Sequence, residues 1–148
     1  MQKVHRFVSR DFAIRVATVN ALNVVQEMQN LQNMKPIPAV GVGQLMIGML
    51  LMASHLREGQ QIGALIKGDG ALNTLFAEAS FDGKTRGYTP HAGFDPGGVL
   101  ATKNSICLRE FLGSAWLQVT RHQPFQKQPH HGTVAMVHGE VDLDLTGY

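Results

Sequence analysis

The residues best suited to acid–base or metal chemistry lie in the last third of the chain. They are four histidines and three acids: His122, His130, His131, His138, Glu140, Asp142 and Asp144. A histidine beside a carboxylate can act as a general base, and clustered histidines can bind a metal ion. His130 and His131 are adjacent, however, and adjacent side chains cannot easily point at one ion. We expect them to lie in a solvated loop flanked by proline.

The three acids have a simpler explanation than catalysis. Glu140, Asp142 and Asp144 fall where a helix is expected to begin. Acidic side chains there are stabilised by the positive end of the helix dipole. No order of nucleophile and base can be argued from the sequence, so we expect no enzyme. The alternative hypothesis is a small α/β-type enzyme that uses a histidine with this acidic group.

Two glycine patterns could bind phosphates or other anions. Gly41-x-Gly43, followed by Gly48, resembles half of a dinucleotide-binding fingerprint, but prolines replace the strand that must precede it. Small residues there are better explained by close packing of sheets against a helix. Gly68-Asp69-Gly70 could hold an anion through its amides. A hairpin turn is the simpler prediction, since glycine adopts positive φ at little cost.

Two further reactive side chains read as structural. His55 ends an uncharged segment, and a neutral, hydrogen-bonded histidine is the expected state there. Cys107 lies between Ile106 and Leu108, which is typical of a small buried apolar residue. A single cysteine allows neither an intrachain disulfide nor a cysteine zinc cluster. We therefore expect no cofactor and no stoichiometric zinc in this chain.

The composition restricts the class of protein and its partners. The 148 residues suit one domain, and apolar residues make up 44% while charged residues make up 16%, so disorder is not expected. A formal net charge of +2 with scattered lysine and arginine argues against a nucleic-acid partner. The N-terminus lacks the apolar region of a signal peptide. We expect a cytoplasmic protein.

The elements that must position these residues are organised around one apolar segment. Residues Ala39–Leu56 (AVGVGQLMIGMLLMASHL) contain no charged side chain. Such a run is either a membrane span or a helix covered by protein on all sides. Eighteen residues span only about 27 Å as a helix, which is marginal for a bilayer. We predict a buried helix over residues 40–56, after a break at Lys35–Pro38, and no membrane partner.

The remaining pattern predicts strands and short helices around that helix. Alternation and turn residues predict strands at 12–19, 61–67, 72–80, 85–89, 115–121 and 133–138. Helical spacing predicts helices at 21–32, with Asn20 as N-cap, at 106–112 and from 140 onward. The predicted fold class is α+β, with two antiparallel-rich sheets enclosing a central buried helix in β/α/β layers.

Several stretches, in order, resemble the N-terminal domain of the heat-shock protein 33 family. They are FAIRVATVNALNVVQEMQ, GVGQLMIGMLLMASHLREGQQIGALIKGDGALNTLFAEAS with FDGKTRGYTPH, and LQVTRHQPFQKQPHHGTVAMVHGEV. The resemblance extends over essentially all of residues 1–148 and implies two sheets around a central helix. It also implies a redox-regulated family of ATP-independent holdase chaperones in the bacterial cytosol. The implied partners are unfolded or partly folded client proteins, and a homodimer is possible.

The family's linker and zinc domain, with its paired cysteines, have no counterpart in this sequence. We therefore expect a truncated chain without the redox switch, and no zinc ligand can be assigned to any position. Exposed apolar side chains on turn-rich segments are the expected client contacts: Phe81, Phe94, Val99, Leu100 and Phe125. The alternative for each is a loop anchor packed on the sheet. A broad apolar surface would favour the chaperone, and a deep polar pocket the enzyme.

Overall fold

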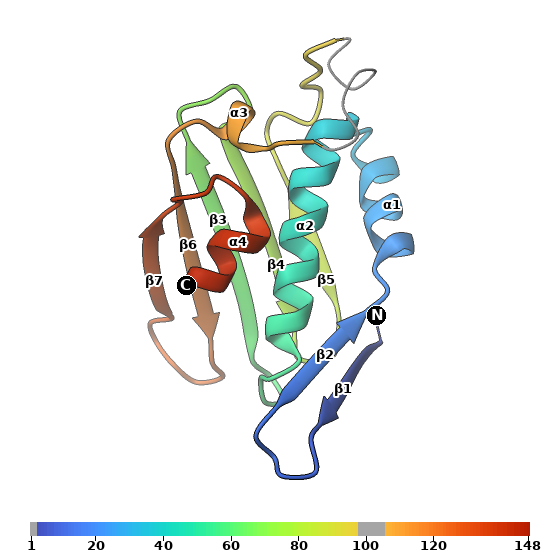
Figure 1. The fold of residues 1–148 in the computed structure, drawn as a ribbon, viewed down its shortest axis with the longest axis vertical. Coiled ribbons are helices and arrows are strands. Elements are labelled where there is room, and N and C mark those ends of the chain that lie inside the picture. Colours follow the sequence, from blue (N-terminus) through green and yellow to red (C-terminus); the bar gives the residue numbers. More distant parts are fainter. Residues whose placement is uncertain (1–2, 98–105) are drawn as a thin grey trace.

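The computed structural model describes residues 3–97 and 106–148, and it shows a mixed α+β fold (Figure 1). The elements are, in chain order, β1 (Val4–Val8), β2 (Arg15–Val19), α1 (Leu22–Leu31), α2 (Pro36–Ala53), β3 (Gln61–Gly68), β4 (Thr74–Ser80), β5 (Thr85–Tyr88), α3 (Arg109–Leu112), β6 (Ala115–His122), β7 (His130–Ala135) and α4 (Val141–Gly147). The strands form a five-stranded antiparallel sheet in the order β5-β4-β3-β6-β7 and a two-stranded sheet, β1-β2.

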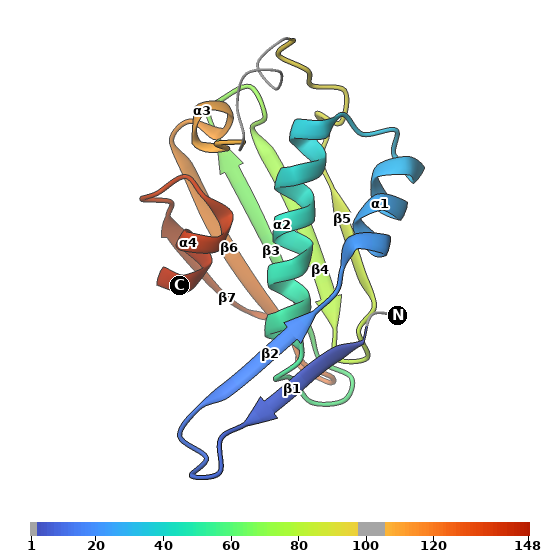
Figure 2. The same ribbon diagram turned by 45° about the vertical axis from the view of Figure 1, so that its right-hand side comes forward.

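The five-stranded sheet buries one face against α2. Its inner face carries alternate residues of each strand, such as Ile66, Leu75 and Leu117, all fully buried. This alternation follows from the two-residue period of a strand. The helices lie on that same side of the sheet, with α1 near β5 and α4 near β7 (Figures 1 and 2). The predicted α+β class with two antiparallel sheets and a central helix is confirmed.

The apolar helix α2 begins earlier than predicted. It starts at Pro36 rather than near Val40, with proline in its first turn. Proline is tolerated there because its fixed φ suits the helix and the first amides have no helical partner in any case. Glycines at the predicted positions allow close contact: a Cβ on Gly41 would lie 2.9 Å from Leu75 Cδ1. Close packing therefore accounts for these glycines.

One stripe of α2 is half-buried rather than enclosed. Although 61% of the helix is buried, its residues Val40, Gln44, Ile47, Gly48, Leu51 and Met52 form a half-buried row. By length and composition α2 could cross a membrane, but buried core helices pass the same test. The row lies on the side of α2 that faces away from the five-stranded sheet. It is half-buried because α1, α4 and β2 cover that side of α2 only in part.

The N-terminal strands differ most from the prediction. The strand β1 was not anticipated, and the strand predicted at 12–19 begins only at Arg15. Residues between β1 and β2 form a turn in which Phe12 has φ of 60°. The resulting hairpin crosses the C-terminal end of α2 and projects beyond the rest of the molecule (Figure 2).

Other boundaries also shift. Ala21, not Asn20, is the N-cap of α1, although Asn20 Oδ1 accepts a hydrogen bond from the Leu22 amide at 3.3 Å. The strand predicted at 133–138 is β7, which begins at His130. His130 and His131 therefore lie in a strand and not in a loop, although both side chains are exposed as expected. Pairing with β6 extends β7 backward into the polar segment.

Candidate functional site: an exposed apolar surface

The most prominent apolar surface of the described residues is on the β1–β2 hairpin. Its members, here called the hairpin surface, are Phe7, Val8, Phe12, Ile14 and Val16. Phe12 is 78% exposed and Ile14 is 62% exposed. By strand alternation Phe7 and Val16 lie on one face of the hairpin and Val8 on the other, so exposed apolar side chains occur on both faces. Single exposed apolar side chains are common, but a concentration of them can mark a binding surface. The hairpin surface is therefore the leading candidate site.

A polar network in the turn holds these apolar side chains outward. The Ile14 amide donates to Ser9 Oγ at 3.0 Å, and the Ala13 amide donates to Asp11 Oδ1 at 3.2 Å. The Ser9 hydroxyl also donates to Asp11, and together these hydrogen bonds lower the pKa of the Asp11 carboxyl. The polar groups of the turn thus hydrogen-bond to one another, and the apolar side chains of the turn lie outside the core.

A hydrogen bond joins β1 to the C-terminal end of α2. Arg6 Nη1 donates to the carbonyl oxygen of Ser54 at 2.8 Å, at the end of α2. A cation at a helix C-terminus is favourable because the unpaired carbonyls there carry negative partial charge. In register, Phe7 lies opposite Val16 across the hairpin. Both are exposed, so this pair faces solvent and not the helix.

A groove between α2 and α4 forms a second apolar surface. It has a volume of about 530 Å³ and is lined by Gln44, Ile47, Gly48, Leu51, Met52, Asp142, Leu145 and Thr146. Gly48 allows α4 to approach, since a Cβ there would lie 2.5 Å from Leu145 Cδ1. Its apolar wall is the half-buried stripe of α2. Methionine in such a wall adapts readily to differently shaped partners.

Asp144 holds α4 in place and is not part of a catalytic cluster. Its carboxylate accepts hydrogen bonds from the amides of Val137, His138 and Glu140 at 3.0–3.2 Å, and lies 3.3 Å from His138 Nδ1. Burial alone would raise the pKa of Asp144, but these hydrogen bonds outweigh it and lower the pKa. Asp142 instead faces the groove, so the three acids do not converge. The buried capping role of Asp144 was not predicted.

The other candidate chemical residues serve local structure. Asp69 Oδ1 accepts from the Ser114 amide at 2.8 Å, and the amides of Gly68, Asp69 and Gly70 bond to backbone carbonyls. The Gly-Asp-Gly segment is therefore a turn, as predicted. Cys107 is half-buried and His55 is exposed. Within residues 3–97 and 106–148, no group of three His, Cys, Asp or Glu side chains could hold a metal ion.

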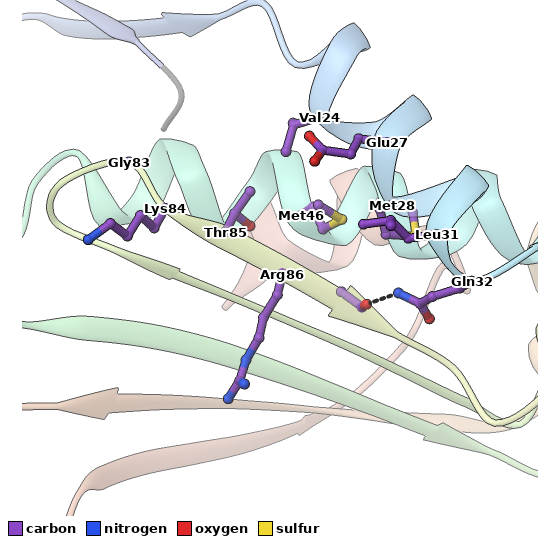
Figure 3. A pocket seen from close by; sticks show the side chains of 11 residues that line it. Val24, Glu27, Met28, Leu31, Gln32, Met46, Gly83, Lys84, Thr85 and Arg86 are labelled. Atoms are coloured by element: carbon purple, nitrogen blue, oxygen red, sulfur yellow. Dashed lines mark hydrogen bonds between the residues drawn. The ribbon is translucent and has the colours of Figure 1, made fainter.

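A second, smaller pocket lies between α1 and β5 (Figure 3). It has a volume of about 260 Å³, and Met28 and Met46 lie among its lining residues. The side chain of Arg86 points away from it, and Gln32 crosses one end to reach the carbonyl of Gly87 (Figure 3). The titratable groups that have shifted pKa values are Asp11, Asp82, Lys84 and Asp144. Among the described residues with such shifts, Lys84 alone lines this pocket.

The predicted contact residues lie in different environments. Phe81 is 41% exposed and borders a pocket with Val4 and Arg6 of the hairpin. Phe125 is fully exposed at the β6–β7 turn, with φ of 66°. Phe94 packs edge-on against Phe111, with ring centroids 5.6 Å apart, so its position favours the loop-anchor alternative. Val99 and Leu100 lie outside the described residues.

Sequence analysis missed the hairpin surface. Its residues were predicted only in part, within a half-buried strand. The available signal was Ser9-Arg10-Asp11, a turn-forming segment between two apolar alternating stretches. Such a pattern predicts a hairpin, but it does not show that the outward face lacks a partner.

Comparisons with known proteins agree with this fold. The family model described as Hsp33 protein matches residues 2–148. Similar proteins include 33 kDa chaperonins from Aquifex aeolicus, 28% identical over 91% of this chain and 42% of the relative, and from Nostoc, 29% identical over 97% and 47%. The crystal structure of a 33 kDa chaperonin from Thermotoga maritima superposes with a TM-score of 0.90 at 25% identity, covering 98% of this chain and 49% of that one. The chain thus spans about half the length of these relatives, and it belongs to the Hsp33 family.

Proposed function

We propose that this chain is the polypeptide-binding domain of an ATP-independent holdase chaperone that acts in the cytoplasm. Its partners are unfolded or partly folded proteins, which it keeps from aggregating. The observation that supports this function is the hairpin surface, where five large apolar side chains between residues 7 and 16 are exposed to solvent. The chaperone names of the relatives agree with it. The half-buried α2–α4 groove extends the surface available to a client.

The geometry suits a partner without a fixed structure. The hairpin offers aromatic and branched side chains on a projecting element, and the groove offers a methionine-containing wall. Neither presents converging charged groups that would select one partner. A surface of this kind binds exposed apolar segments of many sequences, because burial of apolar area is non-directional. Binding by burial alone needs no nucleotide.

Light scattering of a chemically denatured client, with and without the chain, tests the function. We expect the wild-type chain to suppress aggregation and Phe12→Ser to weaken suppression about three- to tenfold, as for loss of a binding hot spot. Leu31→Ser is the matched control, because Leu31 is 79% exposed, like Phe12, but lies on α1. It should behave as wild type. Equal suppression by both variants would show that the hairpin is not the binding surface.

A third variant separates the hairpin from the site predicted on the β6–β7 turn. Phe125→Ser removes the most exposed aromatic side chain of the described residues. We expect a smaller loss of suppression than for Phe12→Ser, because Phe125 lies on the β6–β7 turn and is not a member of the hairpin surface. If Phe125→Ser causes the larger loss, client binding centres on the β6–β7 turn. A wild-type chain that fails to suppress aggregation at any ratio would contradict the function itself.

A further inference from the structure

The five-stranded sheet has two edges, and they differ in how they are protected. Antiparallel strands alternate between residues that bond to the neighbouring strand and residues whose N–H and C=O point away from it. On β5, the Ser80 amide bonds to the Lys84 carbonyl, so by register Thr85 and Gly87 point outward. On β7, the Met136 amide bonds to the Ala115 carbonyl, so His131, Thr133 and Ala135 point outward. Both edges could in principle accept another strand.

The β5 edge is short and partly occupied. It has four residues, and the Gln32 side chain on the C-terminal side of α1 donates to the outward carbonyl of Gly87 at 2.7 Å (Figure 3). A side chain that satisfies an edge carbonyl takes the place of an incoming strand. Short edges and covering helices are common protections against strand addition. The β5 edge is thus short and covered at the Gly87 carbonyl.

The β7 edge is longer and open. It has six residues, without proline and without Asp, Glu, Lys or Arg. Within the described part of the chain, no hydrogen bond reaches the backbone groups of His131, Thr133 or Ala135. All three residues are exposed. Natural edge strands usually carry a charge, a bulge or a cover, so an unprotected edge of this length points to strand addition.

We propose that the β7 edge binds an extended segment of a non-native polypeptide by adding it to the sheet as a further strand. This inference rests on the proposed function and names how the client is held at a second position. The outward N–H and C=O groups of His131, Thr133 and Ala135 recognise the backbone of the segment, whatever its sequence. Tyr148 lies over one face of β7, where a Cβ on Gly132 would meet its hydroxyl at 2.9 Å, and therefore leaves the backbone edge uncovered.

The charge around β7 selects among such segments. No Asp or Glu occurs from Ala115 to Gly139, whereas Arg121 and Lys127 do. An apolar segment flanked by acidic residues is therefore preferred to one flanked by basic residues. A second copy of this chain fits less well. Its own β6–β7 hairpin also lacks acidic residues, so two hairpins without negative charge would meet. The strand is also too short for the ~1,200 Å² that a stable interface needs.

Fluorescence anisotropy with a dye-labelled peptide tests the proposal. The probe alternates valine and threonine over six residues, with two aspartates at each end. We expect Thr133→Pro to weaken binding at least about tenfold. Proline lacks the outward N–H of residue 133, so the hydrogen bond that this N–H would donate to the added strand is lost. That N–H does not pair with β6, so the ladder is preserved. Thr133→Val is the matched control: it keeps the N–H and the shape, and should bind as wild type.

A second measurement does not depend on folding of the variant. A probe N-methylated at alternate amides on one edge, and a second probe methylated on the other edge, are offered to the wild-type chain. One of the two should bind at least about tenfold more weakly than the unmethylated probe. Lysine in place of the aspartates should also weaken binding. Equal binding of all probes, or of Thr133→Pro and wild type, would overturn the proposal.

Aggregation suppression by the same variants separates the two proposals. If Thr133→Pro suppresses aggregation as well as wild type and the methylated probes bind normally, the edge proposal fails and the proposed function stands. If methylation abolishes peptide binding but the wild-type chain suppresses no aggregation, the edge proposal stands and the holdase function fails.

Discussion

The five-stranded sheet and the β1–β2 hairpin have similar strand sequences but opposite relationships to solvent. In the sheet, alternate residues such as Ile66 and Leu117 are fully buried against α2. In the hairpin, Phe7 and Phe12 are 57% and 78% exposed. Burial of apolar area stabilises a fold by roughly 25 cal/mol per Å², so the sheet contributes stability that the hairpin does not. The exposed apolar side chains of the hairpin are the surface on which the proposed function rests.

This difference means that stability and binding can be changed separately. Substitutions in the sheet or in buried α2 should unfold the domain, and substitutions in the hairpin should leave folding nearly intact. In a domain whose binding residues were also core residues, one substitution would reduce stability and binding together. The following experiments test that separation, from the largest expected effect to the smallest.

Leu50→Asp should abolish folding. Leu50 is 1% exposed in α2, and an unpaired buried carboxylate costs several kcal/mol, a large part of a typical 5–15 kcal/mol stability. Leu51→Asp is the matched control, because Leu51 is half-buried beside the groove. It should remain folded. Far-UV circular dichroism and urea unfolding distinguish the two, and a cooperatively folded Leu50→Asp chain would refute the buried helix.

Asp144→Asn should destabilise the domain by about 1–3 kcal/mol at neutral pH, since a charged acceptor of several backbone amides is lost. Because the folded state lowers the pKa of Asp144, its carboxylate stabilises the fold above the ordinary value of 3.8. That contribution is lost as the pH falls through the folded-state pKa. The urea midpoints of wild type and Asp144→Asn should therefore converge as the pH falls below 3.8 and through the folded-state pKa of Asp144. Asp142→Asn, on the exposed side of α4, should show little difference at either pH.

Phe7→Ser should change stability by less than about 1 kcal/mol, the range of one exposed cross-strand pair. Suppression of client aggregation should nevertheless fall. Val119→Ser provides the contrast in the sheet, because Val119 is 2% exposed. Its urea midpoint should fall much more than that of Phe7→Ser. A hairpin substitution as destabilising as Val119→Ser would mean that the hairpin belongs to the core in solution.

Oxidation should have no effect on this chain. Cys107 is its single thiol and is half-buried, distant in sequence from both the hairpin and β7. We expect equal suppression in dithiothreitol and in peroxide, and no change in Cys107→Ser. Activation by peroxide that disappears in Cys107→Ser would assign a regulatory role to this thiol.

Much of the fold was predictable because local signals and burial agreed. The uncharged run around Leu50 indicated a buried helix, and Gly68-Asp69-Gly70 indicated a turn between strands. The candidate site was less predictable. Phe125 is exposed as expected, but Phe94 packs on Phe111, and Phe12 was assigned to a half-buried strand. Apolar alternation shows that a strand has two faces, and it does not show which face finds a partner.

The sequence by itself therefore determined the elements of this protein: a glycine-rich apolar helix, strands separated by turns, and a small basic charge. The tertiary structure decided which apolar groups stay in solvent, because exposure depends on what packs against each face. It also placed the Asp144 carboxylate against the backbone amides of the turn before α4. Gln32 binds the outward Gly87 carbonyl of β5, whereas the β7 edge has no such cover in the described part of the chain. Such contacts depend on the tertiary arrangement, and the local secondary-structure propensity of the sequence does not predict them.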